Sequence, residues 1–219
     1  MSSLPRGRAW VLAIVLSVGF VLVAHAALLQ RLPARVGALV SVIPLVLIFA
    51  WLVRRSRRRA AALLAAGAAL AAGIVFWDEL VANYPSLFFA EHAGTNLALA
   101  ILFGRTLAAG QEPLVARFAR IVHGTIPPEV ERYSRRVTIA WTVFFGTLFT
   151  LSCVLYLGGW IAAWSSLANI ATPVLVCTMF LVEYAVRVRA LPHWEQAGIF
   201  GGVRAFARHM GERPAGAPR

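Results

Sequence analysis

The sequence predicts an all-α, polytopic membrane protein with about six transmembrane helices, both termini in the cytoplasm, and one amphipathic cytoplasmic loop. Hydrophobic residues make up 60% of the 219 residues and charged residues only 14%, with a mean hydropathy of +0.74. Soluble domains of this length are much less apolar. All 21 basic residues are arginines, and most of them cluster in alternate gaps between long apolar segments. Arginines near the ends of membrane helices are retained on the cytoplasmic side, so this spacing predicts an orientation as well as a class.

Six apolar segments are long enough to be membrane spans, because a bilayer core of about 30 Å needs roughly 20 apolar residues in a helix. The fourth is the weakest, since it contains Glu91, His92 and Asn96, and a charge near the middle of a membrane costs about 3 kcal/mol. The segments belong to a single membrane domain, 1–219, with a cytoplasmic loop, 104–136, and a cytoplasmic tail, 187–219. The predicted spans are residues 10–29, 36–53, 60–77, 86–103, 137–159 and 161–186.

The positions of the arginines require the fourth span. With the N-terminus inside, nineteen arginines are cytoplasmic and only Arg31 and Arg35 are outside. Without the fourth span, the arginine groups that precede and follow it would lie on opposite sides of the membrane. Anionic headgroups explain the net charge of +12, and no nucleic-acid partner is predicted, because the arginines flank apolar spans instead of lining one face. The cytoplasmic arginines are Arg6, Arg8, Arg54, Arg55, Arg57, Arg58, Arg59, Arg105, Arg117, Arg120, Arg132, Arg135, Arg136, Arg187, Arg189, Arg204, Arg208, Arg213 and Arg219.

The N-terminus allows a second interpretation. Arg6, Arg8, the apolar stretch after them and the A-x-A-like sequence Ala24-His25-Ala26 together resemble a secretory signal peptide, whose cleavage would leave five spans. The hydrophobic part of a signal peptide is shorter than this stretch, at roughly 7 to 15 residues. We therefore expect the first helix to be retained.

The cytoplasmic loop has the pattern of a short amphipathic helix on the inner membrane surface. Pro113 suits the first turn of a helix, Arg117 and Arg120 lie one turn apart, and His123-Gly124 ends the helix, since glycine is a common helix terminator. Pro127-Pro128 begins a second short segment that leads into the fifth span. The apolar residues that recur at helical spacing are Leu114, Phe118, Ile121 and Val122.

The loop arginines have two interpretations. In the simpler one, they bind lipid phosphates and hold the loop against the membrane. In the other, they bind a specific anion, because the guanidinium fork pairs with phosphate or carboxylate through two hydrogen bonds. Candidate anions are a phospholipid head, a phosphorylated lipid carrier, a CoA-type thioester and the acidic surface of an acyl carrier protein. His123 is either a general base in such a site or an ordinary polar surface residue. The candidate arginines are Arg105, Arg117, Arg120, Arg135 and Arg136.

Ionisable residues inside the spans are functional candidates, because they are costly there unless paired or solvated. Toward the inner side, Glu183 precedes Arg187 by four residues, the favourable order for a structural ion pair within a helix. Toward the outer side, Glu91 beside His92 or His25 is either a proton-handling or ligand site, or a packing contact between spans. No spaced set of three metal ligands is present, so no metal site is predicted. The outer group contains His25, Asp78, Glu79, Glu91 and His92, with Asn96 one helical turn after His92.

Three segments in the C-terminal two-thirds of the chain carry a family resemblance. They are LFGRTLAAGQEPLVARFARIVHG from Leu102, RYSRRVTIAW from Arg132 and VEYAVRVRALPH from Val182. They resemble a family of small bacterial inner-membrane proteins encoded among genes for aryl polyene or xanthomonadin-type pigments. The resemblance implies an inner-membrane location and a pathway in which lipid-like products are built on acyl carriers in the cytoplasm and finish in the envelope.

Some members of that family are labelled ketosynthase, and the residues argue against this chemistry. A ketosynthase needs a nucleophilic cysteine activated by nearby histidines in a much larger soluble fold. Cys153 and Cys177 both lie within predicted spans. The resemblance therefore implies a cellular context and transfers no catalytic residue.

Three functions fit these observations. The leading hypothesis is an accessory membrane protein that assists the assembly or transfer of a lipid-like, aryl-polyene-type product. The second is an intramembrane acyl or lipid transferase with His123 or the Glu91-His92 pair as base, and the third is a small transporter, which is less favoured because no internal repeat is detectable. No P-loop, dinucleotide, nucleophile-elbow or HExxH motif is present, and no cofactor is predicted. The expected partners are membrane lipid, an acyl carrier protein and other proteins of the pigment pathway.

Overall fold

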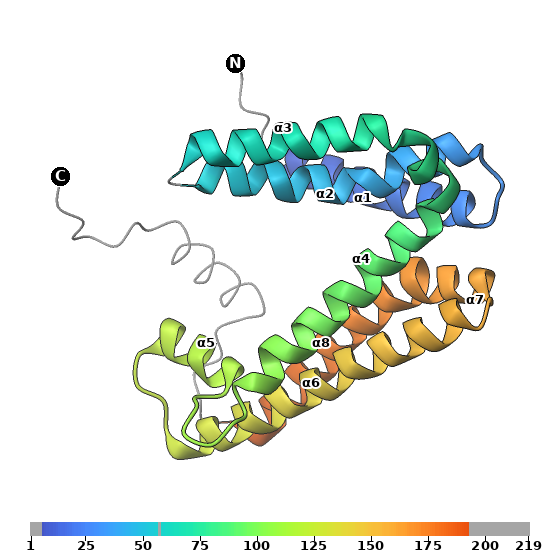
Figure 1. The fold of residues 1–219 in the computed structure, drawn as a ribbon. Helices are drawn as coiled ribbons and strands as arrows, with labels where there is room; N and C mark the ends of the chain where they lie inside the picture. Colours follow the sequence, from blue (N-terminus) through green and yellow to red (C-terminus); the bar gives the residue numbers. More distant parts are fainter. Residues whose placement is uncertain (1–5, 57, 193–219) are drawn as a thin grey trace. The chain divides into compact units, whose positions relative to one another are not determined.

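The computed structural model describes residues 6–56 and 58–192, and this part of the chain is helical with no β-strand (Figure 1). One of the elements is a π-helix, η1, and the others are α-helices. In chain order, the elements are α1 (Arg6–Leu28), α2 (Ala34–Arg55), α3 (Arg59–Val75), α4 (Trp77–Arg105), α5 (Leu114–His123), α6 (Pro128–Leu157), α7 (Ile161–Ser166), η1 (Leu167–Ala171) and α8 (Thr172–Ala190).

Four helical segments in the described residues are long and apolar enough to cross a membrane. They are α2, α4, α6 and the continuous segment Ile161–Ala190, which joins α7, η1 and α8. Two shorter apolar helices are Val15–Leu28 in α1 and α3. The predicted all-helical membrane class is therefore confirmed, whereas the count of six spans and their orientation stay predictions.

Helix α4 begins earlier than the sequence predicts, because residues 78–85 are helical and not a loop. The backbone leaves helical geometry at Asn83 (φ −117°, ψ 18°), two residues before Pro85. A proline inside a helix lacks the N–H for one hydrogen bond and clashes with the preceding turn, which kinks the helix. The kink allows one helix to include both the expected outer connection and the fourth predicted span.

The predicted amphipathic helix is confirmed. Helix α5 runs from Leu114 to His123, with Pro113 before it and Gly124 after it. Gly124 has φ of 77°, in the left-handed region that favours glycine at the end of a helix. The second short segment after Pro127 is the start of α6 itself. The predicted tail begins inside α8, and its residues 193–219 lie outside the described residues, as does Arg57.

The helices form two compact units, which we describe separately. Unit 1 contains the described residues of 1–94 together with 151–173, and unit 2 contains 95–150 together with the described residues from 174 onward. Helices α4, α6 and α8 each contribute residues to both units. The prediction of a single domain stays a prediction.

Unit 1 is packed through small residues and one tyrosine ring. Ala24 and Ala27 of α1 and Ala38 of α2 are fully buried, and such small residues let membrane helices approach closely. Tyr84 of α4 lies against Gly37 of α2, where an added Cβ would be only 2.5 Å from the ring. The Tyr84 hydroxyl donates a hydrogen bond of 2.7 Å to the Ala27 carbonyl. Three helices therefore meet where position 37 has no side chain.

Unit 2 is packed around Trp141 of α6. Its ring stacks on Phe145 with a centroid separation of 5.3 Å and contacts Phe180 of α8 at 4.8 Å. Phe103 of α4 lies 6.2 Å from the same ring. Aromatic pairs at these separations contribute beyond the area they bury, so this cluster joins the three long helices of unit 2.

Candidate functional site

Two threonines fix the start of α5 in unit 2. The first N–H groups of a helix have no partner within it. The Leu114 N–H donates to Thr106 Oγ1 at 3.0 Å, and the Val115 N–H donates to Thr138 Oγ1 at 3.3 Å. Because Leu114 and Ala116 are also buried, α5 is an anchored element. The sequence pattern predicted the helix but gave no sign that these threonines hold it.

Two of the five candidate arginines share one carboxylate. Arg120 Nε donates to Glu112 Oε1 at 2.7 Å, and Arg117 Nε lies 3.9 Å from Glu112 Oε2. The arginine side chains are still 48% and 47% exposed. An exposed pair of this kind contributes about 1 kcal/mol or less, so Glu112 orients these arginines more than it stabilises the fold. Each guanidinium has further N–H donors for an external anion.

The other three candidate arginines are also exposed. Arg135 donates to the Leu107 carbonyl at 3.0 Å, which ties the start of α6 to the segment before α5. Arg105 and Arg136 make no ion pair with a described residue. Of the five, Arg117 and Arg120 are the two that the structure brings together at a common group.

His123 is the last residue of α5 and is half-buried. It follows Arg120 by three residues, a spacing that places two residues on neighbouring positions of a helix surface. It is already engaged in an interaction. This location joins His123 to the arginine-bearing helix but does not identify it as a base.

A second candidate site is a polar network around Trp164 in unit 1. The Trp164 ring is fully buried, and its Nε1–H donates to Ser152 Oγ at 2.8 Å. Ser152 Oγ is also 3.1 Å from His92 Nδ1, and His92 Nε2 is 3.1 Å from Thr172 Oγ1. Side chains from α4, α6, α7 and α8 therefore form one chain of hydrogen bonds. Neither Ser152 nor Trp164 was predicted as a site residue, since hydroxyl and aromatic residues are common in membrane helices.

The hydrogen bonds assign the protons in this network. Thr172 donates its hydroxyl proton to the Leu167 carbonyl at 2.9 Å, so its oxygen accepts from His92 Nε2–H. Trp164 only donates, which leaves the Ser152 proton for His92 Nδ1. In this arrangement His92 donates from Nε2 and accepts at Nδ1. Both ring nitrogens are occupied, and a buried polar cluster among apolar helices is stable when its groups are satisfied in this way.

The π-helix explains why Trp164 and Thr172 reach the same network. An α-helix has 3.6 residues per turn, so two turns take about seven residues. A π-helical turn inserts one extra residue, and η1 lies between these two positions. The eight-residue separation therefore corresponds to about two turns and returns to the same face. Apolar periodicity in the sequence carries no signal for such an insertion.

His25 of α1 belongs to a neighbouring set of polar contacts. Its Nδ1 is 2.8 Å from the buried Ser165 Oγ. Asn169 in η1 donates its Nδ2–H to the Ser165 carbonyl at 3.1 Å and to Ser165 Oγ at 3.3 Å. Asp78 and Glu79, which were grouped with His25 in the sequence, are exposed. The predicted outer group is therefore divided between the half-buried His25, Glu91 and His92 and the exposed Asp78 and Glu79.

Glu91 has one buried oxygen, Oε1, that lacks a hydrogen-bond partner in the described residues. The predicted pairing with His25 or His92 is not observed there; both ring nitrogens of His92 and Nδ1 of His25 lie beside hydroxyl groups instead. A buried polar atom without a partner is costly. Arg187 Nε also lacks a hydrogen bond in this part of the chain but lies in an ion pair with Glu183, so of these two residues Glu91 is the candidate without a charged partner there.

The predicted ion pair between Glu183 and Arg187 is confirmed. Arg187 Nε lies 3.6 Å from Glu183 Oε1. Tyr133 of α6 donates its hydroxyl to the Glu183 carbonyl at 3.1 Å and lies 3.3 Å from Oε1. These contacts join α6 to α8 within unit 2 and support the structural role.

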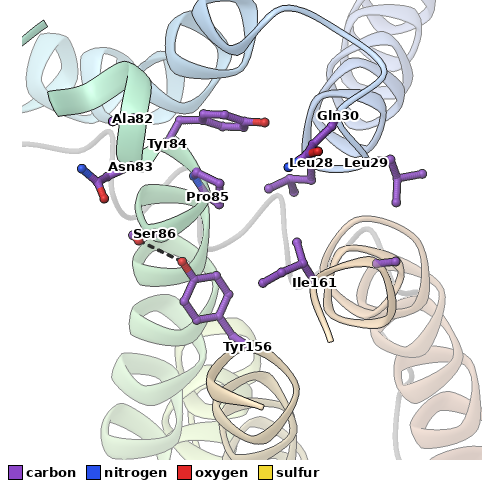
Figure 2. A pocket seen from close by; sticks show the side chains of 11 residues that line it. Leu28, Leu29, Gln30, Ala82, Asn83, Tyr84, Pro85, Ser86, Tyr156 and Ile161 are labelled. Carbon is purple, nitrogen blue, oxygen red and sulfur yellow. Dashed lines mark hydrogen bonds between the residues drawn. The ribbon is translucent and has the colours of Figure 1, made fainter. Parts of the chain in front are cut away.

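An open pocket of about 510 Å³ lies beside the α4 kink in unit 1 (Figure 2). Its walls come from the end of α1, the kinked part of α4, the end of α6 and the start of α7. Gln30, Asn83, Ser86 and Tyr156 supply polar groups, and Ser86 Oγ is 2.8 Å from the Tyr156 hydroxyl. None of these residues was singled out as a site by the sequence, since polar uncharged residues near span ends are common.

No set of three histidine, cysteine or acidic side chains is arranged to hold a metal ion in residues 6–56 and 58–192. Comparisons of the chain with protein-family models, with curated proteins and with solved structures found no match.

Proposed function

We propose that this protein is a six-span inner-membrane protein, with both termini in the cytoplasm, that assists the assembly or transfer of a lipid-like, aryl-polyene-type product. In this proposal, the arginine-rich loop contacts an acidic carrier protein or a phosphorylated lipid. The observation that carries it is the anchored α5 helix, which presents Arg117 and Arg120 together beside Glu112.

The charge of the loop supports an anionic partner. Residues 104–136 contain six arginines and three glutamates, which leaves a net charge of about +3. Phe118 and Ile121, on the same helix as the paired arginines, are 36% and 37% exposed. A helix that exposes both cationic and apolar side chains suits a membrane surface or an acidic protein with an apolar contact patch.

Contacts of the first helix support its retention as a span. Ala24 is fully buried and His25 is bonded to Ser165, so the cleavage region of the signal-peptide interpretation is part of the packed core of unit 1. Sequencing of the mature N-terminus tests this point. A mature chain beginning after Ala26 would leave five spans.

The partner is tested by binding holo-acyl carrier protein to the full-length protein in nanodiscs. Arg120→Glu should lower the affinity at least tenfold, as expected for reversing one charge at a close contact. Arg132→Glu is the matched control, since Arg132 is an exposed loop arginine outside the candidate group, and should change the affinity less than twofold. Equal losses for the two variants would contradict a specific dock, and His123→Ala should have little effect.

The biological role is tested by mass spectrometry of pigment-lipid intermediates in a deletion strain. Loss of an accessory protein should change the ratio of carrier-bound intermediates to finished product. A profile identical to that of the wild type would overturn the proposal. Accumulation of finished product inside the cell would favour the transporter alternative instead.

The transferase alternative is favoured by one observation, the buried Glu91 Oε1 without a hydrogen-bond partner in the described residues. His92 is a poorer base, because both of its ring nitrogens are occupied. A transferase predicts that Glu91→Gln blocks product formation while the protein remains inserted in the membrane. An accessory role predicts that this variant supports normal product formation.

A further inference from the structure

The pocket beside the α4 kink has a polar rim that the helix itself creates. Pro85 has no N–H, so the carbonyl of Val81, which lines an adjoining groove, receives no helical hydrogen bond from position 85. Asn83 donates its Nδ2–H to the Glu79 carbonyl at 3.0 Å, and its Oδ1 remains an acceptor. Broken helical backbone in a membrane protein is tolerated where it lines a cavity or is buried.

The other polar groups in the pocket are also uncharged. The Gln30 side chain is exposed and makes no hydrogen bond to a described side chain or backbone group. The backbone of Gln30 has φ of 57°. This left-handed conformation ends α1, where the Arg31 N–H donates to the Ala26 carbonyl at 3.0 Å. Ser86 and Tyr156 provide two hydroxyl groups that share one hydrogen bond. Together they offer donors and acceptors without formal charge.

The charges around the pocket exclude an anionic ligand head. No arginine or histidine lines it, and neither Arg31 nor Arg35 does so, although they follow Gln30 closely in sequence. An adjoining groove of about 500 Å³ shares Gln30 and Pro85 with the pocket and adds the carboxylate of Asp78. A phosphate in the pocket would have no cationic side chain in its lining, and the adjoining groove adds a carboxylate of the same sign of charge.

The remaining walls suit an apolar group. The Tyr156 ring stacks on Phe89 at 4.2 Å and meets the edge of Trp164 at 5.2 Å, so its position is fixed by the core of unit 1. Leu28 and Ile161 complete the apolar side, as Figure 2 shows. Pockets of this volume with a few placed polar groups are typical of small-molecule sites.

We propose that this pocket binds an amphiphile with an uncharged, hydroxyl-bearing headgroup of glycerol size and a hydrocarbon tail. Gln30, Asn83 and the Ser86–Tyr156 pair receive the hydroxyl groups, and Leu28 and Ile161 contact the first part of the tail. The site lies in unit 1 and does not depend on the arginine loop. Its failure would leave the proposed function unchanged.

The test uses the full-length protein in phosphatidylcholine nanodiscs and a monoacylglycerol with a photoreactive diazirine near the glycerol end of its chain. Peptide mass spectrometry should locate the crosslinks at residues 28–30, 82–86 or 156–162. Lysophosphatidic acid with the same diazirine chain should label these residues about tenfold less, as expected for an unpaired charge. Equal labelling by the two probes, or labelling spread evenly over the lipid-facing helices, would overturn the proposal.

A matched pair of substitutions tests the pocket itself. Ala162 lines the pocket, whereas Ala163 is exposed and does not. Ala162→Trp should lower monoacylglycerol labelling at least fivefold, and Ala163→Trp should leave it within twofold of the wild type. Gln30→Asn provides an independent check, because asparagine tolerates the positive φ and only shortens the side chain. If the Gln30→Asn variant and the Ala162→Trp variant are both labelled as strongly as the wild type, the proposed site is contradicted.

Discussion

At the scale of single residues, position 37 decides how closely α2 and α4 approach. A Cβ on Gly37 would lie 2.5 Å from Tyr84 Cε2 and within 3 Å of two more ring atoms. The ring cannot move freely, because its hydroxyl is bonded to the Ala27 carbonyl. We expect Gly37→Ala to destabilise the protein by about 1–3 kcal/mol through overpacking.

Thermal unfolding of the detergent-solubilised protein measures this effect. Gly73→Ala in α3 is the control, because an added Cβ there meets no atom within 4 Å and alanine favours the helix by about 0.5–1 kcal/mol. The two variants should therefore shift the melting temperature in opposite directions. A common direction would show that the Tyr84 contact does not limit position 37.

Ser152 is the residue on which the Trp164 network depends most. Ser152→Ala removes the acceptor for Trp164 Nε1 and the donor for His92 Nδ1. Leaving buried polar groups without partners costs about 1–3 kcal/mol, so we expect a loss of that size. Ser166→Ala, at an exposed serine bonded only to its own helix at Ala162, should cost less than about 0.5 kcal/mol. Equal unfolding temperatures for the two variants would argue against the network.

Residue types alone could not predict this network. The sequence marked His25, His92 and Glu91 because ionisable groups in apolar spans are unusual. Their partners Ser152, Ser165 and Thr172 are small hydroxyl residues that are frequent in membrane helices, where most bond to their own backbone, as Thr178 does at 2.8 Å. A hydroxyl group that joins two helices therefore has the same appearance in a sequence as one that does not.

At the scale of elements, α5 was predictable because three local signals agree. A proline before the helix, amphipathic spacing within it and a glycine after it each depend on near neighbours in the chain. The kink at Asn83 was harder to predict from the sequence, although Pro85 indicates its approximate position. The π-helix could not be predicted from the sequence, since its single extra residue leaves the composition of the apolar segment unchanged.

The anchoring of α5 can be tested through Thr106. Thr106→Val keeps the shape of the side chain but removes the acceptor for the Leu114 N–H, at an expected cost of about 1 kcal/mol to the local structure. Hydrogen exchange at residues 114–117 should rise severalfold, while exchange in α6 stays constant. Thr125→Val, at an exposed position after α5, is the control, and equal exchange in the two variants would contradict the anchoring role.

At the scale of the whole molecule, the helical membrane class followed from composition, and the orientation rests on arginine counts. The predicted topology places nineteen arginines inside and two outside, which is a strong bias. This bias predicts the orientation of the helices in the membrane but not how they pack against one another. The division into two units has no such signal, because α4, α6 and α8 run through both without a linker or a change in composition.

Cysteine labelling tests the orientation. In a background with Cys153→Ala and Cys177→Ala, Arg31→Cys should react with a membrane-impermeant maleimide in intact spheroplasts. Gln111→Cys should react only after permeabilisation, because the arginine-rich loop is cytoplasmic in the six-span topology. Both positions are exposed, so a difference in reactivity reports the side of the membrane. Reaction of Gln111→Cys in intact spheroplasts would contradict the topology.

The five residues of η1 also set the helical phase between Trp164 and Thr172 in unit 1. If these residues kept their number but formed an ordinary α-helix, Thr172 would lie about 100° away from the face that carries Trp164, whereas deletion of one residue would restore seven residues per two turns and keep that face. The Thr172 hydroxyl would leave His92 in the first case and keep its direction in the second. The number of residues in this segment and its π-helical geometry therefore compensate each other, and neither can change alone without moving Thr172 off the face that carries Trp164.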